Sequence, residues 1–251
     1  KMLRARARRD IESGRNYESD LLKDAPFKIR QGFIKKVYSI LSTQLIATAL
    51  LSCYAMMTAK HGFGLFMIQN SWAVIVMAVI NLITSIVLFC YRNIARKVPH
   101  NYALLAVFTV TEAWIVAHLC AWYKLMGKGD IVLMALLMTA TVTVSLTLYA
   151  CTTKKDFTMK GGSLFIFASA LFLMSIFCYF SRNHILHMII TVATIILYGF
   201  YLIYDTQLVI GGKTHQLNID DYILGSVILY IDIIVLFTRI LKVLGSKDRR
   251  Q

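Results

Sequence analysis

Three carboxylates lie in stretches of the sequence that otherwise hold almost no ionisable group. Glu112 falls inside the third long apolar segment, Asp205 directly follows the sixth, and Asp232 lies inside the last. A charge at the centre of a lipid bilayer costs about 2.5–3.5 kcal/mol, so carboxylates at that depth face a partner or a water-filled cavity. These three side chains are therefore the candidates for chemistry, which would be the binding and release of protons.

Asp205 and Asp232 are predicted to form a pair. The apolar residues 208–210 allow the sixth helix to continue past Asp205 as far as Gly211, which would bury its carboxylate. Asp232 lies near the middle of its segment, and neighbouring antiparallel helices would bring the two together. Carboxylates in contact share one proton, because burial and like charge both oppose a second ionisation. The charge of such a pair changes near physiological pH.

Each carboxylate also has an ordinary structural interpretation. Asp205 can end its helix in water, and Asp232 can be held for packing by a Lys, Arg or Tyr side chain. Glu112 can be a protonated acid that hydrogen-bonds a neighbouring helix. We expect Glu112 to matter less than the aspartates, because its own helix offers no second carboxylate at matching depth.

The elements that position these residues are predicted to be membrane-spanning helices. Hydrophobic residues make up 58% of the 251 residues and charged residues only 16%, whereas soluble domains carry about 25% charge. About 20 consecutive apolar residues cross the hydrocarbon core as a helix. The sequence therefore predicts an all-α, polytopic membrane bundle of six to seven transmembrane helices. The predicted spans are 37–58, 72–91, 102–123, 131–151, 163–180, 184–204 and 222–238, with a short loop at 60–71.

Positive charge is concentrated outside these spans. Eighteen Lys and Arg residues lie in the N-terminal arm and in the connections after the second, fourth and sixth spans, whereas four lie in the other three connections. This asymmetry follows the positive-inside rule and places the arm on the cytosolic side. The net charge of +14 is thus explained by the orientation of the chain in the membrane and by attraction to anionic lipid head groups. No zinc-finger or RNP motif indicates nucleic-acid binding.

Three regions are expected along the chain: a polar, basic arm (1–32), a transmembrane domain (33–245) and a basic tail (246–251). The side of the tail is left open by the charge pattern. Seven complete spans would place the tail opposite the arm, against the positive-inside rule. A re-entrant last helix would instead return the tail to the side of the arm.

The sequence lacks the patterns of catalytic and metal-binding sites. Its five cysteines fall about one per span without a C-x-x-C pair. It contains no metal-spaced His/Glu cluster, no nucleophile motif and no phosphate-binding loop. We therefore expect neither an enzyme nor a resident metal or cofactor. Two other classes remain, a transport protein and a non-conducting scaffold or accessory subunit of a larger membrane assembly.

Several ordered motifs are similar to one known family. The segment 210–222 (Ile-Gly-Gly-Lys-Thr-His-Gln-Leu-Asn-Ile-Asp-Asp-Tyr), bracketed by 204–206 and 230–234, closely resembles the lifeguard branch of the Bax-inhibitor-motif membrane proteins. The resemblance runs from about residue 27 to 245 and is greatest to the Golgi anti-apoptotic proteins of that branch. Further matching motifs lie at 33–41, 99–101, 108–109, Glu112 and 154–158.

The resemblance implies a function and the residues that perform it. It implies a bundle with the last helix at its centre, a pH-sensitive calcium leak from internal stores and suppression of cell death. Family members carry paired aspartates at the positions of Asp205 and Asp232, which would be the pH sensor and a transient calcium site. Glu112 is a candidate for the ion pathway. An arginine near the end of the second span is thought to latch the pair, and either Arg92 or Arg96 matches it.

This sequence departs from the family pattern at two places. The family's Ser-Pro-Glu-Glu-Tyr is replaced at 218–222 by Asn-Ile-Asp-Asp-Tyr, which keeps two acids and loses the proline. Val235 stands where the last span usually has asparagine, which removes a polar group from the expected pathway. These departures bear on conduction rather than on the fold.

The location and partners are expected from the same resemblance. It points to the Golgi or the endoplasmic reticulum. The arginine cluster at 4–9 points instead to a mitochondrial presequence and the inner mitochondrial membrane, although the acidic residues from Asp10 onward argue against it. The expected partners are the lipid bilayer, calcium ions and other membrane proteins.

Overall fold

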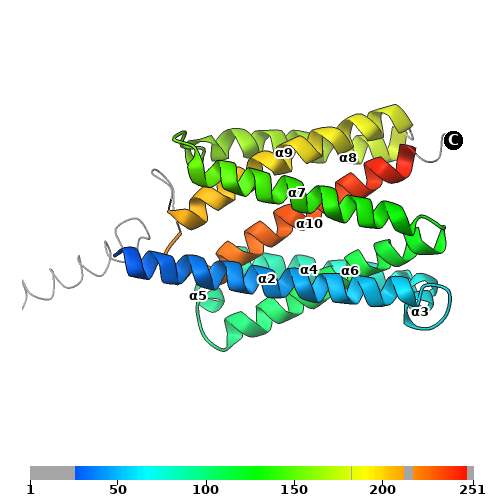
Figure 1. Cartoon of the computed structure of the whole chain (residues 1–251), viewed down its shortest axis with the longest axis horizontal. Helices are drawn as coiled ribbons and strands as arrows, with labels where there is room; N and C mark the ends of the chain where they lie inside the picture. The colour runs from blue at the N-terminus through cyan, green and yellow to red at the C-terminus, as the bar shows by residue number, and fades with distance from the viewer. Residues whose placement is uncertain (1–25, 182, 212–216, 248–251) are drawn as a thin grey trace, which may run out of the picture.

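The protein is an all-α bundle in its computed structural model (Figure 1), as the sequence predicts. The structure describes residues 26–181, 183–211 and 217–247, so most of the expected arm and tail lies outside it. Within this part, six helices are long and apolar enough to cross a membrane: α2, α4, α6, α7, α8 and α9. The elements are α2 (Phe27–Met57), α3 (Phe63–Gln69), α4 (Trp72–Cys90), α5 (Arg92–Ala95), α6 (His100–Leu125), α7 (Gly129–Thr152), the 3-10 turn η1 (Thr158–Lys160), α8 (Gly161–Ser181), α9 (His184–Ile210) and α10 (Tyr222–Lys247).

The first helix, α2, begins ten residues before the predicted span, which started at residue 37. Hydropathy identifies the part of a helix that lies in lipid, whereas the helix itself continues as long as one face can pack. The buried stripe of α2 starts at Phe33 and continues at Val37 and Leu41, with helical spacing. These residues belong to the main core, so packing extends the helix towards Pro26.

The loop predicted at 60–71 contains a short helix, α3. Seven residues are too few to show a helical periodicity in the sequence, and tertiary packing stabilises this one. Met67 is fully buried, and the ring of Phe63 meets Trp114 edge-on with centroids 5.5 Å apart. At Gly64 a Cβ atom would overlap the carbonyl oxygen of Ala55, so only glycine lets α3 approach α2 this closely.

The last helix, α10, lies at the centre of the bundle. In Figure 1 it crosses between a group formed by α2, α4 and α6 and a second group formed by α7, α8 and α9. Its side chains Tyr230, Leu236 and Leu241 are fully buried, whereas the outer helices expose large apolar residues such as Ile75 and Phe165. Such an outer surface matches lipid rather than water. The expected central position of the last helix is confirmed.

The ends of α10 show that it runs the full length of the bundle. Tyr222, its first residue, contacts Asn101 at the start of α6. Gly245 packs against Tyr123, near the end of the same helix. α10 therefore extends along most of α6, which is a candidate membrane span, and its end lies opposite the start of α2 (Figure 1). This direction favours seven crossings over a re-entrant last helix.

Cysteine labelling tests this arrangement. In a cysteine-free background, we expect a membrane-impermeant maleimide to label Lys97→Cys from the side of the arm. Lys128→Cys and Lys242→Cys should react only from the other side, because the α6–α7 connection and the end of α10 lie at the opposite end of the bundle. Labelling of positions 97 and 242 from the same side would contradict seven crossings.

Candidate functional site

The sixth spanning helix carries Asp205 into the interior. α9 continues through Asp205 to Ile210 and ends at Gly211, whose left-handed backbone (φ 98°) closes the helix. The predicted extension of this helix past Asp205 is thus confirmed. The side chain of Asp205 is 8% exposed, and that of Asp232 on α10 is 3% exposed. Asp205 is therefore not a helix end in water.

The structure brings Asp205 and Asp232 together. Their carboxyl groups interact electrostatically, and both side chains line one cavity. Two buried carboxyl groups that interact favour a state with one shared proton, because burial and like charge both oppose a second ionisation. Among the described residues, the buried Oδ2 of Asp232 has no hydrogen-bonding partner. The proximity of the two aspartates is as expected from the sequence, and the shared proton stays a prediction.

A cavity of about 200 Å³ adjoins the pair, and two tyrosines line it. Tyr198 and Tyr201 lie seven and four residues before Asp205, which places all three on one face of α9. Neither tyrosine was among the candidate residues expected from the sequence, although this spacing on one helix face indicates both. The remaining lining residues are apolar: Phe89, Ala168, Ile228 and Ile231.

A third polar group extends the site along α10. Tyr198 interacts electrostatically with Asp232 and also with Arg239. Arg239 follows Asp232 by seven residues, or two helical turns, so both side chains lie on the same face of α10. The polar residues of α9 and α10 therefore continue from the pair towards the end of α10.

Glu112 lies on α6 and belongs to a different part of the interior. It is half-buried and interacts electrostatically with Tyr230 of α10. The hydroxyl groups of Tyr230 and Thr48 are 2.7 Å apart and hydrogen-bonded. Tyr230 precedes Asp232 by two residues, about 200° around the helix, so Glu112 and Asp205 approach α10 from different sides.

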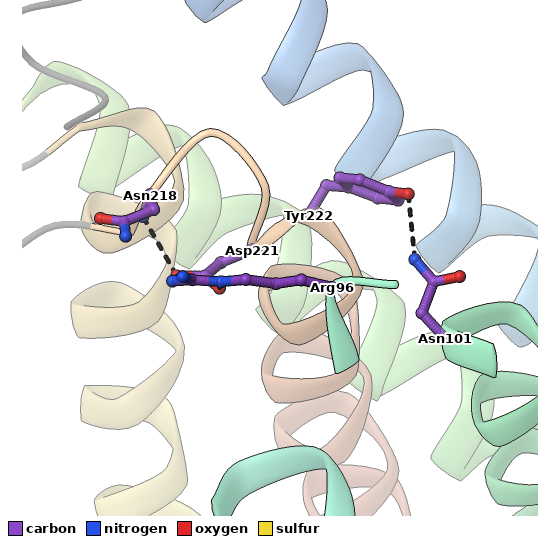
Figure 2. Close-up of polar contacts among 5 residues, drawn as sticks. All are labelled: Arg96, Asn101, Asn218, Asp221 and Tyr222. Atoms are coloured by element: carbon purple, nitrogen blue, oxygen red, sulfur yellow. Dashed lines mark hydrogen bonds and ion pairs between the residues drawn. The ribbon is translucent and has the colours of Figure 1, made fainter. Parts of the chain in front are cut away.

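The two candidate latch arginines lie beside the start of α10. Arg92 is exposed on the short helix α5. Arg96, which follows that helix, binds the carboxylate of Asp221 with two hydrogen bonds, Nε to Oδ1 at 2.7 Å and Nη2 to Oδ2 at 2.9 Å. The backbone N–H of Asn218 also donates to this carboxylate at 3.2 Å. Figure 2 shows the planar guanidinium group facing Asp221. Arg96 thus engages a carboxylate outside the predicted pair.

The neighbouring residue Tyr222 joins three helices at the same place. Nδ2 of Asn101 on α6 donates to the Tyr222 hydroxyl at 3.1 Å (Figure 2). The ammonium group of Lys36 on α2 lies 4.2 Å from the centre of the Tyr222 ring, a cation–π contact. The motif Asn-Ile-Asp-Asp-Tyr therefore fixes the start of the central helix through its last two residues.

Comparison with known proteins identifies the family. The model of the family described as "Inhibitor of apoptosis-promoting Bax1" matches residues 30–249. The chain belongs to this Bax inhibitor family. It is 32% identical over 225 residues to Protein lifeguard 3 of Homo sapiens, covering 88% of this chain and 70% of that protein. It is also 32% identical over 249 residues to Protein LIFEGUARD 2 of Arabidopsis thaliana, covering 95% and 97% respectively.

A further stretch singled out for its family resemblance, 154–158, has a structural role in this Bax inhibitor. Oε1 of Gln207 accepts a hydrogen bond from the backbone N–H of Phe157 at 2.7 Å, and Nε2 donates to the carbonyl of Lys155 at 2.9 Å. Asp156 accepts hydrogen bonds from the backbone and hydroxyl of Thr158. The connection before η1 is thereby tied to α9 two residues beyond Asp205.

The ion pair at the start of α10 yields a stability prediction. Arg96→Gln should lower the free energy of unfolding by about 1–3 kcal/mol, because it leaves a buried carboxylate without its charge partner while the arginine itself is partly solvated. The side chains are 30% and 4% exposed for Arg96 and Asp221. Chemical denaturation in mixed micelles measures the change.

Arg92→Gln is the matched control, because Arg92 is exposed on α5, the short helix that directly precedes Arg96. It should change the free energy of unfolding by less than about 0.5 kcal/mol. A double-mutant cycle of Arg96→Gln with Asp221→Asn isolates the pair, with an expected coupling of about 1 kcal/mol or more. A coupling near zero would show that the ion pair does not stabilise the start of α10.

Proposed function

We propose that this Bax inhibitor family member is a pH-sensitive calcium leak pathway of an internal membrane, with Asp205 and Asp232 as its sensor. The observation that carries the proposal is that two buried carboxyl groups, one on α9 and one on the central helix α10, line the same cavity. Buried carboxylates inside membrane helices are expensive and are typical of proton and ion pathways. The cavity beside the pair provides space for water or an ion.

Protonation would control how closely α9 and α10 pack. With one proton on the pair, the carboxyl groups would attract each other through a shared hydrogen bond. With none, two negative charges about 4 Å apart repel by about 4 kcal/mol at an effective dielectric of ~20. This repulsion favours separation of the helices or entry of water and cations. Because α10 is central, a shift of this helix would alter its packing on α2, α6 and α7.

Calcium is a suitable ion for such a pair. It prefers oxygen ligands and takes six to eight of them. The described residues contain no group of three His, Cys, Asp or Glu side chains placed to hold a metal ion. The aspartates, with the nearby tyrosine hydroxyl groups, would therefore bind calcium incompletely and release it again. Weak, transient binding is what passage requires.

The other candidate residues have supporting roles in this proposal. Arg96, bound to Asp221, would hold the start of α10 in place, and Arg92 remains the second candidate for the latch. Glu112, on the opposite side of α10, would line part of the pathway without sensing pH. The absence of asparagine at Val235 leaves Asp232 as the main polar group in the middle of α10, with Asp205 of α9 beside it.

The cellular role follows from the family. The family is described as an inhibitor of apoptosis-promoting Bax1, and relatives carry the name lifeguard. We propose a cytoprotective role in the Golgi or endoplasmic reticulum, with the inner mitochondrial membrane as the alternative. Imaging the full-length protein with a C-terminal tag distinguishes these membranes.

Calcium flux tests the sensor directly. In liposomes loaded with a calcium dye, we expect the wild-type chain to show flux that changes with pH. Asp205→Asn and Asp232→Asn should each give a flat profile, because an amide cannot take part in the shared ionisation. Glu112→Gln, a matched change at a third carboxylate inside the bundle, should keep the wild-type pH dependence.

Other outcomes would contradict parts of this proposal. Unchanged pH profiles in both aspartate variants would exclude the pair as the sensor. A flat profile in Glu112→Gln would add Glu112 to it. Absence of wild-type flux at every pH would favour the second function class, a non-conducting scaffold or an accessory subunit of a membrane assembly.

A further inference from the structure

A second cavity, of about 350 Å³, lies at the end of the bundle opposite the Arg96–Asp221 pair. It forms where the end of α10 packs against the start of α9 and the end of α6. The packing is close: at Gly245 a Cβ atom would overlap the ring of Tyr123. The residues that line it are Tyr123, His184, His187, Met188, Thr191, Lys242, Gly245 and Ser246.

The polar groups of this cavity are suited to an anion. Lys242 supplies an ammonium group, and His184 and His187 each have a ring N–H whether neutral or charged. None of the described residues that line the cavity is acidic. The hydroxyl of Ser246 donates to Sδ of Met188 at 3.0 Å, which joins α10 to α9 at the wall.

Like charges crowd this end of α10. Lys242 and Arg239 lie one turn apart and interact electrostatically. Like-charge pairs at this spacing destabilise a helix. An anion beside Lys242 would offset the repulsion and would add charge-assisted hydrogen bonds, the stronger class.

The surface beside the cavity is apolar and faces lipid. Ile185 and Ile189 lie on the same first turns of α9 as the two histidines, and their side chains are 66% and 57% exposed. The cavity thus combines cationic donors with an apolar flank at the level where the spanning helices end. A phospholipid matches this arrangement: its phosphate can face the cationic donors while its acyl chains lie against the apolar flank.

We propose that this cavity binds the phosphate of an anionic phospholipid from the leaflet at this end of the bundle. Lys242 and His187 donate hydrogen bonds to the phosphate oxygens, and the acyl chains lie along Ile185 and Ile189. This site is distinct from the aspartate pair and does not depend on calcium conduction.

Native mass spectrometry of the purified full chain tests the proposal with phosphatidylglycerol and phosphatidylcholine of matched acyl chains. The first phosphatidylglycerol should bind about tenfold more tightly than phosphatidylcholine, because the two lipids share the phosphodiester but the trimethylammonium group of phosphatidylcholine would be repelled by Lys242 and Arg239. This preference should disappear in the double variant Lys242→Gln/His187→Gln. Lys242→Arg, which keeps the charge, should retain it.

Lys124→Gln is the matched control, because Lys124 is exposed at the same end of the bundle and does not line the cavity. It should keep the preference for phosphatidylglycerol. Equal binding of both lipids to the wild type would overturn the proposal, as would an equal loss of preference in the control. Displacement of the lipid by millimolar inorganic phosphate would identify a site for free anions and would overturn the lipid assignment.

Discussion

The position of Asp232 near the middle of a membrane-spanning helix is the constraint on which most of this structure depends. An ionisable group at that depth has to be kept away from acyl chains and given a polar partner. The bundle does both: α10 lies between two groups of apolar helices, and α9 supplies Asp205 (Figure 1). The outer helices therefore carry the lipid-facing surface, and the central helix carries the polar groups.

The central helix is held at both ends and in its middle. At one end Arg96 and Asn101 bind its first turn and the residue before it. At the other end α10 approaches α6 so closely that only glycine fits at position 245. The carboxyl pair lies between these fixed points. A change in its protonation would therefore act on a helix whose ends resist movement, which favours bending or local hydration over displacement of the whole helix.

The sequence was sufficient to predict the parts of the structure that depend on local composition. The apolar spans were predicted, and residues 208–210 correctly indicated that α9 continues past Asp205. The ion pair of Arg96 with Asp221 joins positions 125 residues apart, and no local pattern encodes such a contact. The short helix α3 exists because of packing on its neighbours, so hydropathy could not reveal it. The sequence also could not predict on which side of the membrane α10 ends. The positive-inside rule placed the basic tail on the side of the arm, whereas seven complete spans placed it on the opposite side.

The direction of α10 has a consequence for how the protein is made. With the start of α2 on the cytosolic side, as the charge asymmetry predicts, the basic end of α10, with Arg239 and Lys242, would have to cross the membrane, against the usual retention of such residues on the cytosolic side. A helix that also carries Asp232 gains little from insertion into lipid alone. The polar surroundings of Asp232 include Asp205 and Tyr198, which belong to α9. Insertion of the last segment would then depend on packing against helices that are synthesised before it.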